Sequence, residues 1–203
     1  MTAGKRVFDI VLCLWLILWL GLPIVVISVL ILLRDGFPIF YRSERMLKPG
    51  QSFTLWKFRT MRVKSDDGGV SGGDKTGRVT AFGRSLRRRR LDELPQLWNI
   101  FKGDISFVGP RPPLRQYVSR FPDIYSEVLK SRPGVTGLAT IFLHGREERL
   151  LSSCKSPEET DKIYTTQCLP VKARLDLIYQ HNRSVCMDIW LIWRTMVLAF
   201  GPR

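Results

Sequence analysis

The chain has 203 residues, of which 45% are hydrophobic and 25% are charged, and its 32 lysines and arginines outnumber its 18 aspartates and glutamates to give a formal net charge of +14. This composition excludes a disordered, collagen-like or disulfide-scaffold protein and provides enough apolar material for one core. So basic a surface usually meets nucleic acid or the anionic face of a membrane.

The first element is an apolar segment, residues 10–33, which runs for 24 residues without a charged side chain. About 20 such residues suffice to cross a bilayer. Pro23 stands near the midpoint, where proline removes a backbone hydrogen bond and bends a helix. Basic residues flank both ends, so the positive-inside rule draws both toward the cytoplasm. Two topologies stay open on these residues: a helix bent at Pro23 that enters and leaves by one face, and a kinked single span.

The remaining elements follow in chain order. Alternating apolar and polar residues predict a short hairpin over residues 37–58, and the glycine-rich stretch 65–77 predicts a loop. The segment 109–113 holds three prolines and must be a stiff turn. Helices are expected at 80–90, 92–102, 114–130, 157–164, 171–181 and 188–200. The last of these carries two tryptophans one turn apart, which favours an interfacial helix over a core helix.

Asp92 and Glu93 are the strongest candidates for chemistry. Pro95 is tolerated only in the first turn of a helix, so both acids should lie at or beside a helix N-terminus, where ionised carboxylates are favoured. Four arginines, residues 87–90, stand directly before them. Adjacent acids in such a field can share a divalent cation or divide the roles of nucleophile and metal ligand. The alternative is an aspartate N-cap with surface ion pairs, beside a solvated arginine run.

Three more basic residues are candidates for phosphate binding. Arg111 lies between two prolines, so its side chain has little entropy to lose when its bidentate fork binds a phosphate. Lys57 and Arg59 end the hairpin in the sequence KFRTM and could meet phosphate oxygens. The alternatives are an incidental loop arginine and a basic strand edge that resists aggregation. The cysteines form no CxxC pair and the histidines have no metal-ligand spacing, so we expect reduced thiols and no zinc or haem site.

Several fragments coincide with one family, in order and across nearly the whole chain. They are Lys5, Arg6 and Asp9 opening the apolar segment, KFRTM at 57–61, LDELPQLWNIFKGDISFVGPRP at 91–112, and RPGVTGLA at 132–139. Together they closely resemble the bacterial sugar transferases called monotopic phosphoglycosyl transferases, in the minimal form without additional membrane spans. LDELPQL followed by KGD and GPRP is highly specific, whereas any one piece alone would be weak.

The resemblance implies a reaction and roles for individual residues. In that family an aspartate attacks the β-phosphate of a UDP-sugar, releases UMP, and carries the sugar-phosphate until a polyprenyl phosphate such as undecaprenyl phosphate takes it over. Asp92 would be the nucleophile and Glu93 its partner at Mg²⁺. Such a scheme suits a weak carboxylate nucleophile, because Mg²⁺ and arginines relieve its repulsion from the diphosphate. The expected phosphate- or nucleotide-binding residues are Lys57, Arg59, Arg87, Arg111, Arg146 and Asp188.

The resemblance also implies a topology and a cellular place. We expect an α+β, mainly helical protein with a re-entrant membrane-anchoring helix at 1–36 and a compact cytosolic catalytic domain at 37–203 that ends in an interfacial helix. It would act on the cytoplasmic face of a bacterial inner membrane, in the first membrane step of glycoconjugate or exopolysaccharide assembly. The expected partners are a UDP-sugar, polyprenyl phosphate and phospholipid, without nucleic acid; a homodimer stays open.

Two departures from the family pattern limit what the resemblance implies. Leu22 stands where a serine commonly precedes the central proline, so one hydrogen bond that supports the bend is missing. Residues 140–146 replace a common Gln-Val-Asn-Gly-Arg, so the identity of the sugar cannot be inferred from relatives. The alternative function is a membrane-anchored basic module that binds nucleic acid or anionic lipid through Arg84 and residues 87–90 without catalysis.

Overall fold

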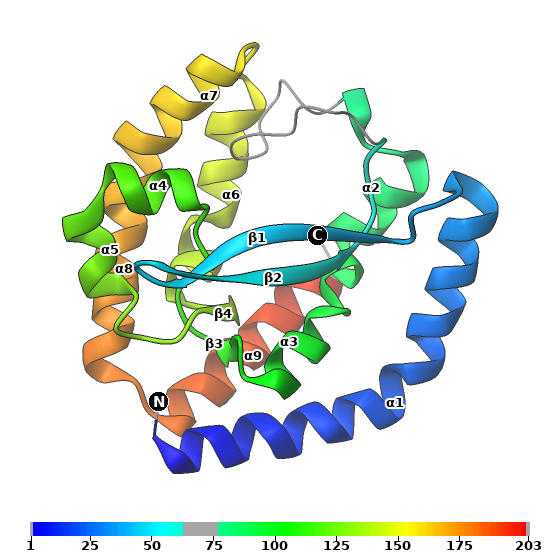
Figure 1. Cartoon of the computed structure of the whole chain (residues 1–203), viewed down its shortest axis with the longest axis horizontal. Helices are drawn as coiled ribbons and strands as arrows, with labels where there is room; N and C mark the ends of the chain where they lie inside the picture. Colours follow the sequence, from blue (N-terminus) through cyan, green and yellow to red (C-terminus); the bar gives the residue numbers. More distant parts are fainter. Residues whose placement is uncertain (1, 63–76, 202–203) are drawn as a thin grey trace.

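The computed structural model describes residues 2–62 and 77–201, and this part of the chain is mainly helical with a few strands, as expected (Figure 1). Its elements are α1 (Ala3–Asp35), β1 (Phe40–Lys48), β2 (Gln51–Phe58), α2 (Ala81–Arg88), the 3₁₀ turn η2 (Leu91–Glu93), α3 (Gln96–Lys102), β3 (Ser106–Val108), α4 (Arg115–Arg120), α5 (Pro122–Val128), β4 (Gly134–Thr136), α6 (Leu138–Ser152), α7 (Pro157–Ile163), the π-helical turn η3 (Tyr164–Cys168), α8 (Leu169–Asn182) and α9 (Val185–Phe200).

Helix α1 contains the apolar segment and packs along one side of the protein. Figure 1 shows that it bends partway along its length, and Pro23 is an interior residue of the helix. Within the described residues, it is the one helix long and apolar enough to cross a bilayer. Cys13 and Ile31 are fully buried against the body, whereas Leu18 and Leu33 are more than three-quarters exposed. The helix therefore has an inner side that joins the core and an apolar outer side.

Both ends of α1 are fixed to the same body. Near its start, Arg6 donates hydrogen bonds to two carbonyl oxygens at the end of α3, each at 2.7 Å. At its other end, Arg59 donates to the carbonyl oxygens of Asp35 and Gly36 at 2.6 and 2.5 Å. A hydrogen bond of 2.9 Å from the Thr80 hydroxyl to the Asp35 carboxylate adds a second contact there. Hydrogen bonds thus fix both the first and the last turn of α1 to the rest of the protein.

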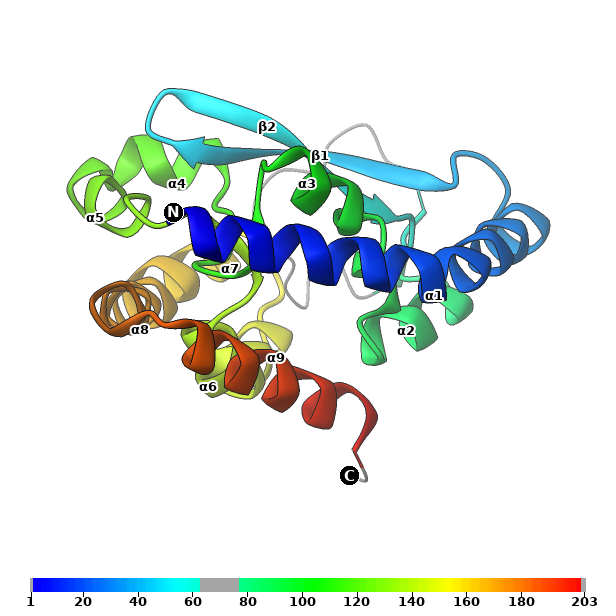
Figure 2. The same cartoon turned by 90° about the horizontal axis from the view of Figure 1, so that it is seen from below.

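The predicted hairpin is present as the antiparallel pair β1 and β2 (Figure 2). Gly50 has a φ of 78°, which its turn requires and which other residues rarely adopt. The open edge of β2 is covered by Asn99 from α3, whose amide donates to the Thr54 carbonyl at 2.8 Å and accepts from the Trp56 amide at 3.0 Å. Asn99 is completely buried, so it ties the helix after the Asp-Glu pair to the strand that carries Lys57.

A short parallel pair, β3 and β4, was not expected from the sequence. It is possible because the backbones cross closely at glycines: a side chain at Gly109 would collide with the Arg132 carbonyl, and one at Gly134 would collide with Gly109 itself. The expected stiff turn at 109–113 follows β3 directly, so the close crossing of the two backbones fixes the position of the turn that carries Arg111.

Several helix boundaries differ from the expected ones. The single helix expected at 114–130 is two, α4 and α5, because Pro122 disfavours a helical conformation at Phe121. The helix expected from residue 92 begins only at Gln96, after the turn η2. Helix α6 was missed, since its polar stretch around Arg146 hides the apolar period. The loop expected at 65–77 lies, apart from Gly77, outside the described residues.

Candidate active site

The Asp-Glu pair lies in a sharp turn between two helices. Arg90, two residues after the end of α2, has a φ of 56°, a left-handed conformation that is uncommon for a residue with a side chain. The chain then forms the turn η2, and Pro95 caps the start of α3. Asp92 and Glu93 are 9% and 8% exposed. The position beside a helix start is confirmed, while the alternative of a surface N-cap is wrong, because both acids are buried and neither caps α3.

The Glu93 carboxylate forms ion pairs with three basic side chains from different parts of the chain. Its Oε1 lies 2.9 Å from Lys57 Nζ on β2 and 3.0 Å from an Arg111 nitrogen, and its Oε2 lies 3.0 Å from an Arg90 nitrogen. Burial opposes the charge of Glu93, but Lys57, Arg111 and Arg90 together outweigh it and hold the pKa of Glu93 well below its usual range. Glu93 therefore stays ionised and holds the three cations in place.

Asp92 is in a different electrostatic position from its neighbour. Burial raises the pKa of Asp92, and the negative charge of Glu93 adds to that rise, while Lys57, Arg87 and Arg111 oppose it. In the part of the chain that the structure describes, no hydrogen bond or ion pair holds its carboxylate oxygens. A carboxylate that is weakly hydrated and free of hydrogen-bond donors, yet surrounded by cations, is suited to act as a nucleophile toward phosphorus.

The structure brings together three of the predicted phosphate-binding residues: Lys57, Arg87 and Arg111. Burial and the charge of Arg111 lower the pKa of Lys57, although Glu93 counteracts them. Glu93 raises the pKa of Arg111 by more than partial desolvation lowers it. Arg87 is oriented by Thr60, whose hydroxyl lies 2.8 Å from its Nε. The three basic side chains therefore surround the two acids with positive charge.

The other three predicted binding residues lie elsewhere. Arg59 is occupied at the end of α1, as described above. Arg146 is exposed on α6. Asp188 is 2% exposed on α9 and pairs with Lys5 at 2.6 Å, and it accepts a hydrogen bond of 2.7 Å from the Tyr179 hydroxyl. The roles of these three residues in substrate binding stay predictions.

Two site residues were not singled out from the sequence. Arg90 was one of four arginines in a row, and only its left-handed backbone shows why it alone turns back to Glu93. Arg45 shares a face of the hairpin with Lys57, since it stands four residues beyond Tyr41, which pairs with Lys57. Alternation along the expected hairpin could have identified Arg45, whereas no local pattern indicates the conformation of Arg90.

Asp92 and Glu93 are also the residues that could bind Mg²⁺. Among the described residues, no group of three or more histidine, cysteine, aspartate or glutamate side chains converges on one point. Mg²⁺, however, is commonly bound by one or two carboxylates together with substrate phosphates and water. The oxygens of Asp92 are free of donors in the described structure, and Glu93 Oε2 has a single cationic partner. The pair thus suits an ion that the substrate's phosphates help to bind.

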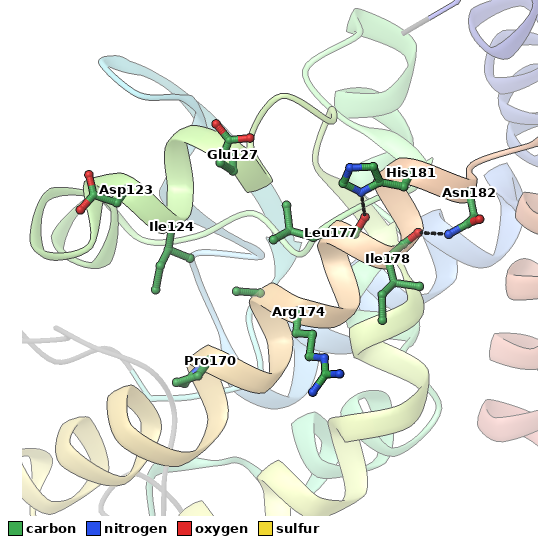
Figure 3. A pocket seen from close by; sticks show the side chains of 10 residues that line it. Asp123, Ile124, Glu127, Pro170, Arg174, Leu177, Ile178, His181 and Asn182 are labelled. Carbon is green, nitrogen blue, oxygen red and sulfur yellow. Dashed lines mark hydrogen bonds between the residues drawn. The ribbon is translucent and has the colours of Figure 1, made fainter.

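A hollow on the surface between α5 and α8 is a separate feature (Figure 3). It has a volume of about 680 Å³. Ile124, Leu177, Glu127 and Arg174 are among the residues that line it. None of the residues that line it belongs to the Asp92–Glu93 cluster, so it adds nothing to the candidate site.

Comparison with known proteins identifies related sequences. The sequence profile of the family described as "Bacterial sugar transferase" matches residues 1–201. An uncharacterized sugar transferase of Bacillus subtilis is 38% identical over 137 residues, which are 68% of this chain and 67% of that protein. A UDP-N-acetylgalactosamine-undecaprenyl-phosphate N-acetylgalactosaminephosphotransferase of Aeromonas hydrophila is 31% identical over 185 residues, 87% of this chain. These matches confirm the resemblance drawn from the motifs.

Some relatives are much longer than this chain. A UDP-glucose:undecaprenyl-phosphate glucose-1-phosphate transferase of Escherichia coli is 32% identical over 200 residues, which are 97% of this chain but 40% of that protein. The match to the Aeromonas protein likewise covers 39% of its length. Although the match covers less than half of the Escherichia coli protein, it covers nearly all of this chain and so includes the Asp-Glu turn.

Proposed function

The chain belongs to the bacterial sugar transferase family, and we propose that it transfers a sugar-1-phosphate from a UDP-sugar to a polyprenyl phosphate such as undecaprenyl phosphate, with release of UMP. The observation that carries this proposal is the pairing of two acids with different environments. Glu93 pairs with three cations, while Asp92 is buried among cations with no donor on its oxygens in the described structure. One acid organises the site and the other is available to react.

In the first step, an oxygen of the Asp92 carboxylate forms a bond to the β-phosphorus of the UDP-sugar. The bond between that phosphorus and the bridging oxygen breaks, and UMP departs with the electron pair. Lys57 and Arg111 compensate the charge of the transferring group, which otherwise would repel the attacking carboxylate. The product is a sugar-phosphate held on Asp92 as an acyl phosphate.

In the second step, a phosphate oxygen of the polyprenyl phosphate attacks the same phosphorus. The bond to Asp92 breaks, the carboxylate is restored, and a polyprenyl diphosphate sugar leaves. No net proton transfer is required, because both nucleophiles and both leaving groups are oxyanions. The site therefore needs fixed positive charge more than a general base, which agrees with the five basic residues around two acids: Lys57, Arg45, Arg87, Arg90 and Arg111.

Asp92 and Glu93 would hold Mg²⁺ together with the diphosphate. When bound, the ion supplies further neutralisation of the phosphate oxygens. Independently of activity, Mg²⁺ should raise the thermal unfolding midpoint more in the presence of UDP than alone, since the diphosphate completes its coordination. The variant Asp92→Asn should lose part of this effect of Mg²⁺.

We further propose that α1 is re-entrant. A helix that spans a bilayer places its two ends on opposite faces, yet both ends of α1 bind the same body through Arg6 and Arg59. Its outer side is apolar throughout, with Leu22 and Leu33 about three-quarters exposed, and would face lipid. Helix α9 exposes Trp190, Trp193 and several aliphatic side chains, which suits it to the membrane interface. Cysteines introduced at Thr2 and at Gly36 should both be labelled from the cytoplasmic side by an impermeant reagent.

The covalent intermediate tests the reaction directly. Detergent-solubilised protein is mixed with a panel of UDP-sugars and Mg²⁺ without an acceptor, quenched in acid and weighed by mass spectrometry. We expect a mass increase of one sugar-phosphate on Asp92 and no more than one UMP per protein until polyprenyl phosphate is added. The variant Asp92→Asn has nearly the same shape and no charge, so it should form no adduct.

Two outcomes would contradict the proposal. An adduct on another residue would show that Asp92 is not the nucleophile, and full transfer by Asp92→Asn would show that no aspartyl intermediate is needed. The alternative of a basic binding module makes a separate prediction: nucleic-acid binding that weakens steeply with salt and needs no Mg²⁺. Arg89→Ala, an exposed change in the same arginine run, is the matched control for effects of charge alone.

A further inference from the structure

We propose that Arg45 binds the α-phosphate of the UDP-sugar, the phosphate that leaves in UMP, beside Arg111. The inference rests on the proposed function and adds a residue to its substrate site. It follows from the position of Arg45 in the hairpin, from the absence of a carboxylate partner in the described structure, and from its place beside the turn that carries Arg111.

The hairpin places Arg45 and Lys57 on one face. Lys57 is opposite Tyr41, and Arg45 follows on the same side of β1, two alternations further along. Their Cα atoms are thus separated by about 13 Å along the strand direction. Arg111 bonds to Glu93 together with Lys57, and its neighbour Pro112 has its carbonyl oxygen 3.5 Å from a terminal nitrogen of Arg45. Arg45 therefore lies beside the turn that carries Arg111.

Arg45 lacks the partner that a half-buried arginine usually has. Its Nε donates to the Ser43 hydroxyl at 3.1 Å, and a terminal nitrogen lies 3.5 Å from the Pro112 carbonyl oxygen. Neither group is charged, and no ion pair with a carboxylate is formed within residues 2–62 and 77–201. Burial and the adjacent Arg111 lower the pKa of Arg45 to about 10, so it remains protonated at neutral pH. An uncompensated cation next to a second one favours an anionic ligand.

The hairpin register separates Arg45 from the reacting phosphate. Lys57, Arg87 and Arg111 are the cations that counteract the raised pKa of Asp92. Arg45 lies about 13 Å further along the strand direction than Lys57. Since Asp92 attacks the β-phosphate, a cation further along the hairpin and beside the turn that carries Arg111 is placed for the next phosphate of the substrate. Negative charge develops there as UMP departs, which a forked guanidinium stabilises.

This assignment gives Arg45 a role in both halves of the reaction. Displacement at phosphorus is in line, so polyprenyl phosphate attacks from the side that UMP left, and its phosphate takes the place of the α-phosphate. Arg45 should therefore affect UMP binding, adduct formation and adduct discharge. A residue that only supports the fold would instead lower the thermal unfolding midpoint, which Arg45→Gln should leave unchanged.

The experiment compares Arg45→Gln with Arg42→Gln. Arg42 lies on the opposite face of the same strand, exposed and 5.6 Å from the Trp56 ring centre, so the control makes the same change of charge away from the site. Single-turnover adduct formation and adduct discharge are followed by mass spectrometry, and UMP binding by titration calorimetry. Arg45→Gln should slow adduct formation and weaken UMP binding by about 10-fold to 100-fold, the usual loss for a charge-assisted hydrogen bond. Its adduct discharge should also be slower than that of wild type, and Arg45→Lys should recover part of each loss.

The contrary results fall on two statements, the role of Arg45 and the proposed function. Unchanged UMP binding in Arg45→Gln, or a loss of UMP binding that Arg45→Lys does not recover at all, would refute the role of Arg45. If wild type released no UMP from any UDP-sugar, the proposed function would fail, while calorimetry with UMP would still decide whether Arg45 binds a nucleotide phosphate. An equal loss in Arg42→Gln would show a general effect of charge and likewise refute the assignment.

Discussion

At the Asp-Glu turn one carboxylate, Glu93, pairs with three cations, whereas at the start of α1 one cation, Lys5, lies between two carboxylates. The Lys5 amine is 3.1 Å from Asp9 and 2.6 Å from Asp188. Asp9 is completely buried and Asp188 is 2% exposed, and Tyr179 donates a further hydrogen bond to Asp188. The two clusters thus have opposite charge balance in the same small protein.

The difference matches the proposed roles, a site that receives a ligand and a joint that holds helices. The Glu93 cluster has surplus positive charge, and Arg111 in it is 42% exposed, which suits it to bind a substrate anion. The Lys5 cluster joins α1 to α9 and has surplus negative charge, which disfavours a substrate anion. Removing the central residue of each cluster should therefore have different consequences: lost stability at Lys5 and lost turnover at Glu93.

The largest expected change in stability follows from Lys5→Met. The substitution keeps the length of the side chain but leaves two buried carboxylates without their cation, which typically costs about 3–5 kcal/mol. The thermal unfolding midpoint in detergent should fall clearly. Lys102→Met, at a half-exposed residue 3.5 Å from Asp104, is the matched control and should change the midpoint little.

A double variant sharpens this test and also addresses Asp188. Lys5→Met with Asp188→Asn removes one of the stranded charges, while the introduced amide oxygen can still accept from the Tyr179 hydroxyl, so the midpoint of the double variant should lie above that of Lys5→Met. If Asp188→Asn alone left stability unchanged but weakened UDP-sugar binding, the joint would be the wrong interpretation and the role implied by the resemblance would be favoured.

Glu93→Gln should have a smaller effect on folding and a large one on turnover. The amide cannot hold Lys57, Arg90 and Arg111 as the carboxylate does, so the cations no longer converge on the reacting phosphate. Loss of one such preorganised electrostatic element typically reduces kcat by about 100-fold to 1,000-fold. UMP binding should not weaken, because the site becomes more positive. Steady-state UMP release and calorimetry measure the two quantities, and a parallel loss of UMP binding would contradict the role of Glu93 as an organiser.

Much of the site could be predicted, because its residues are close in sequence or lie in rigid motifs. Asp92, Glu93 and Pro95 define their own turn, and the prolines beside Arg111 restrict its backbone whatever surrounds it. The Lys5–Asp188 pair could not be predicted, since it joins the two ends of the chain through packing alone. The contact of Arg90 with Glu93 could not be predicted for another reason. It depends on a left-handed backbone at Arg90, which costs energy and is imposed only by the surrounding fold.

The smallest expected effect is a shift in pH dependence, and its sign distinguishes the roles of the residues around Asp92. Adduct formation needs ionised Asp92, so its rate should fall as the pH drops through the raised pKa of Asp92. Glu93→Gln removes a negative neighbour and should move this acid limb to lower pH. Lys57→Met removes a positive neighbour and should move it to higher pH. Single-turnover adduct formation across a pH series measures both, with Arg89→Ala as the unmoved control. A general loss of stability would move the acid limbs of the two variants in the same direction. Only shifts in opposite directions therefore support Asp92 as the titrating nucleophile.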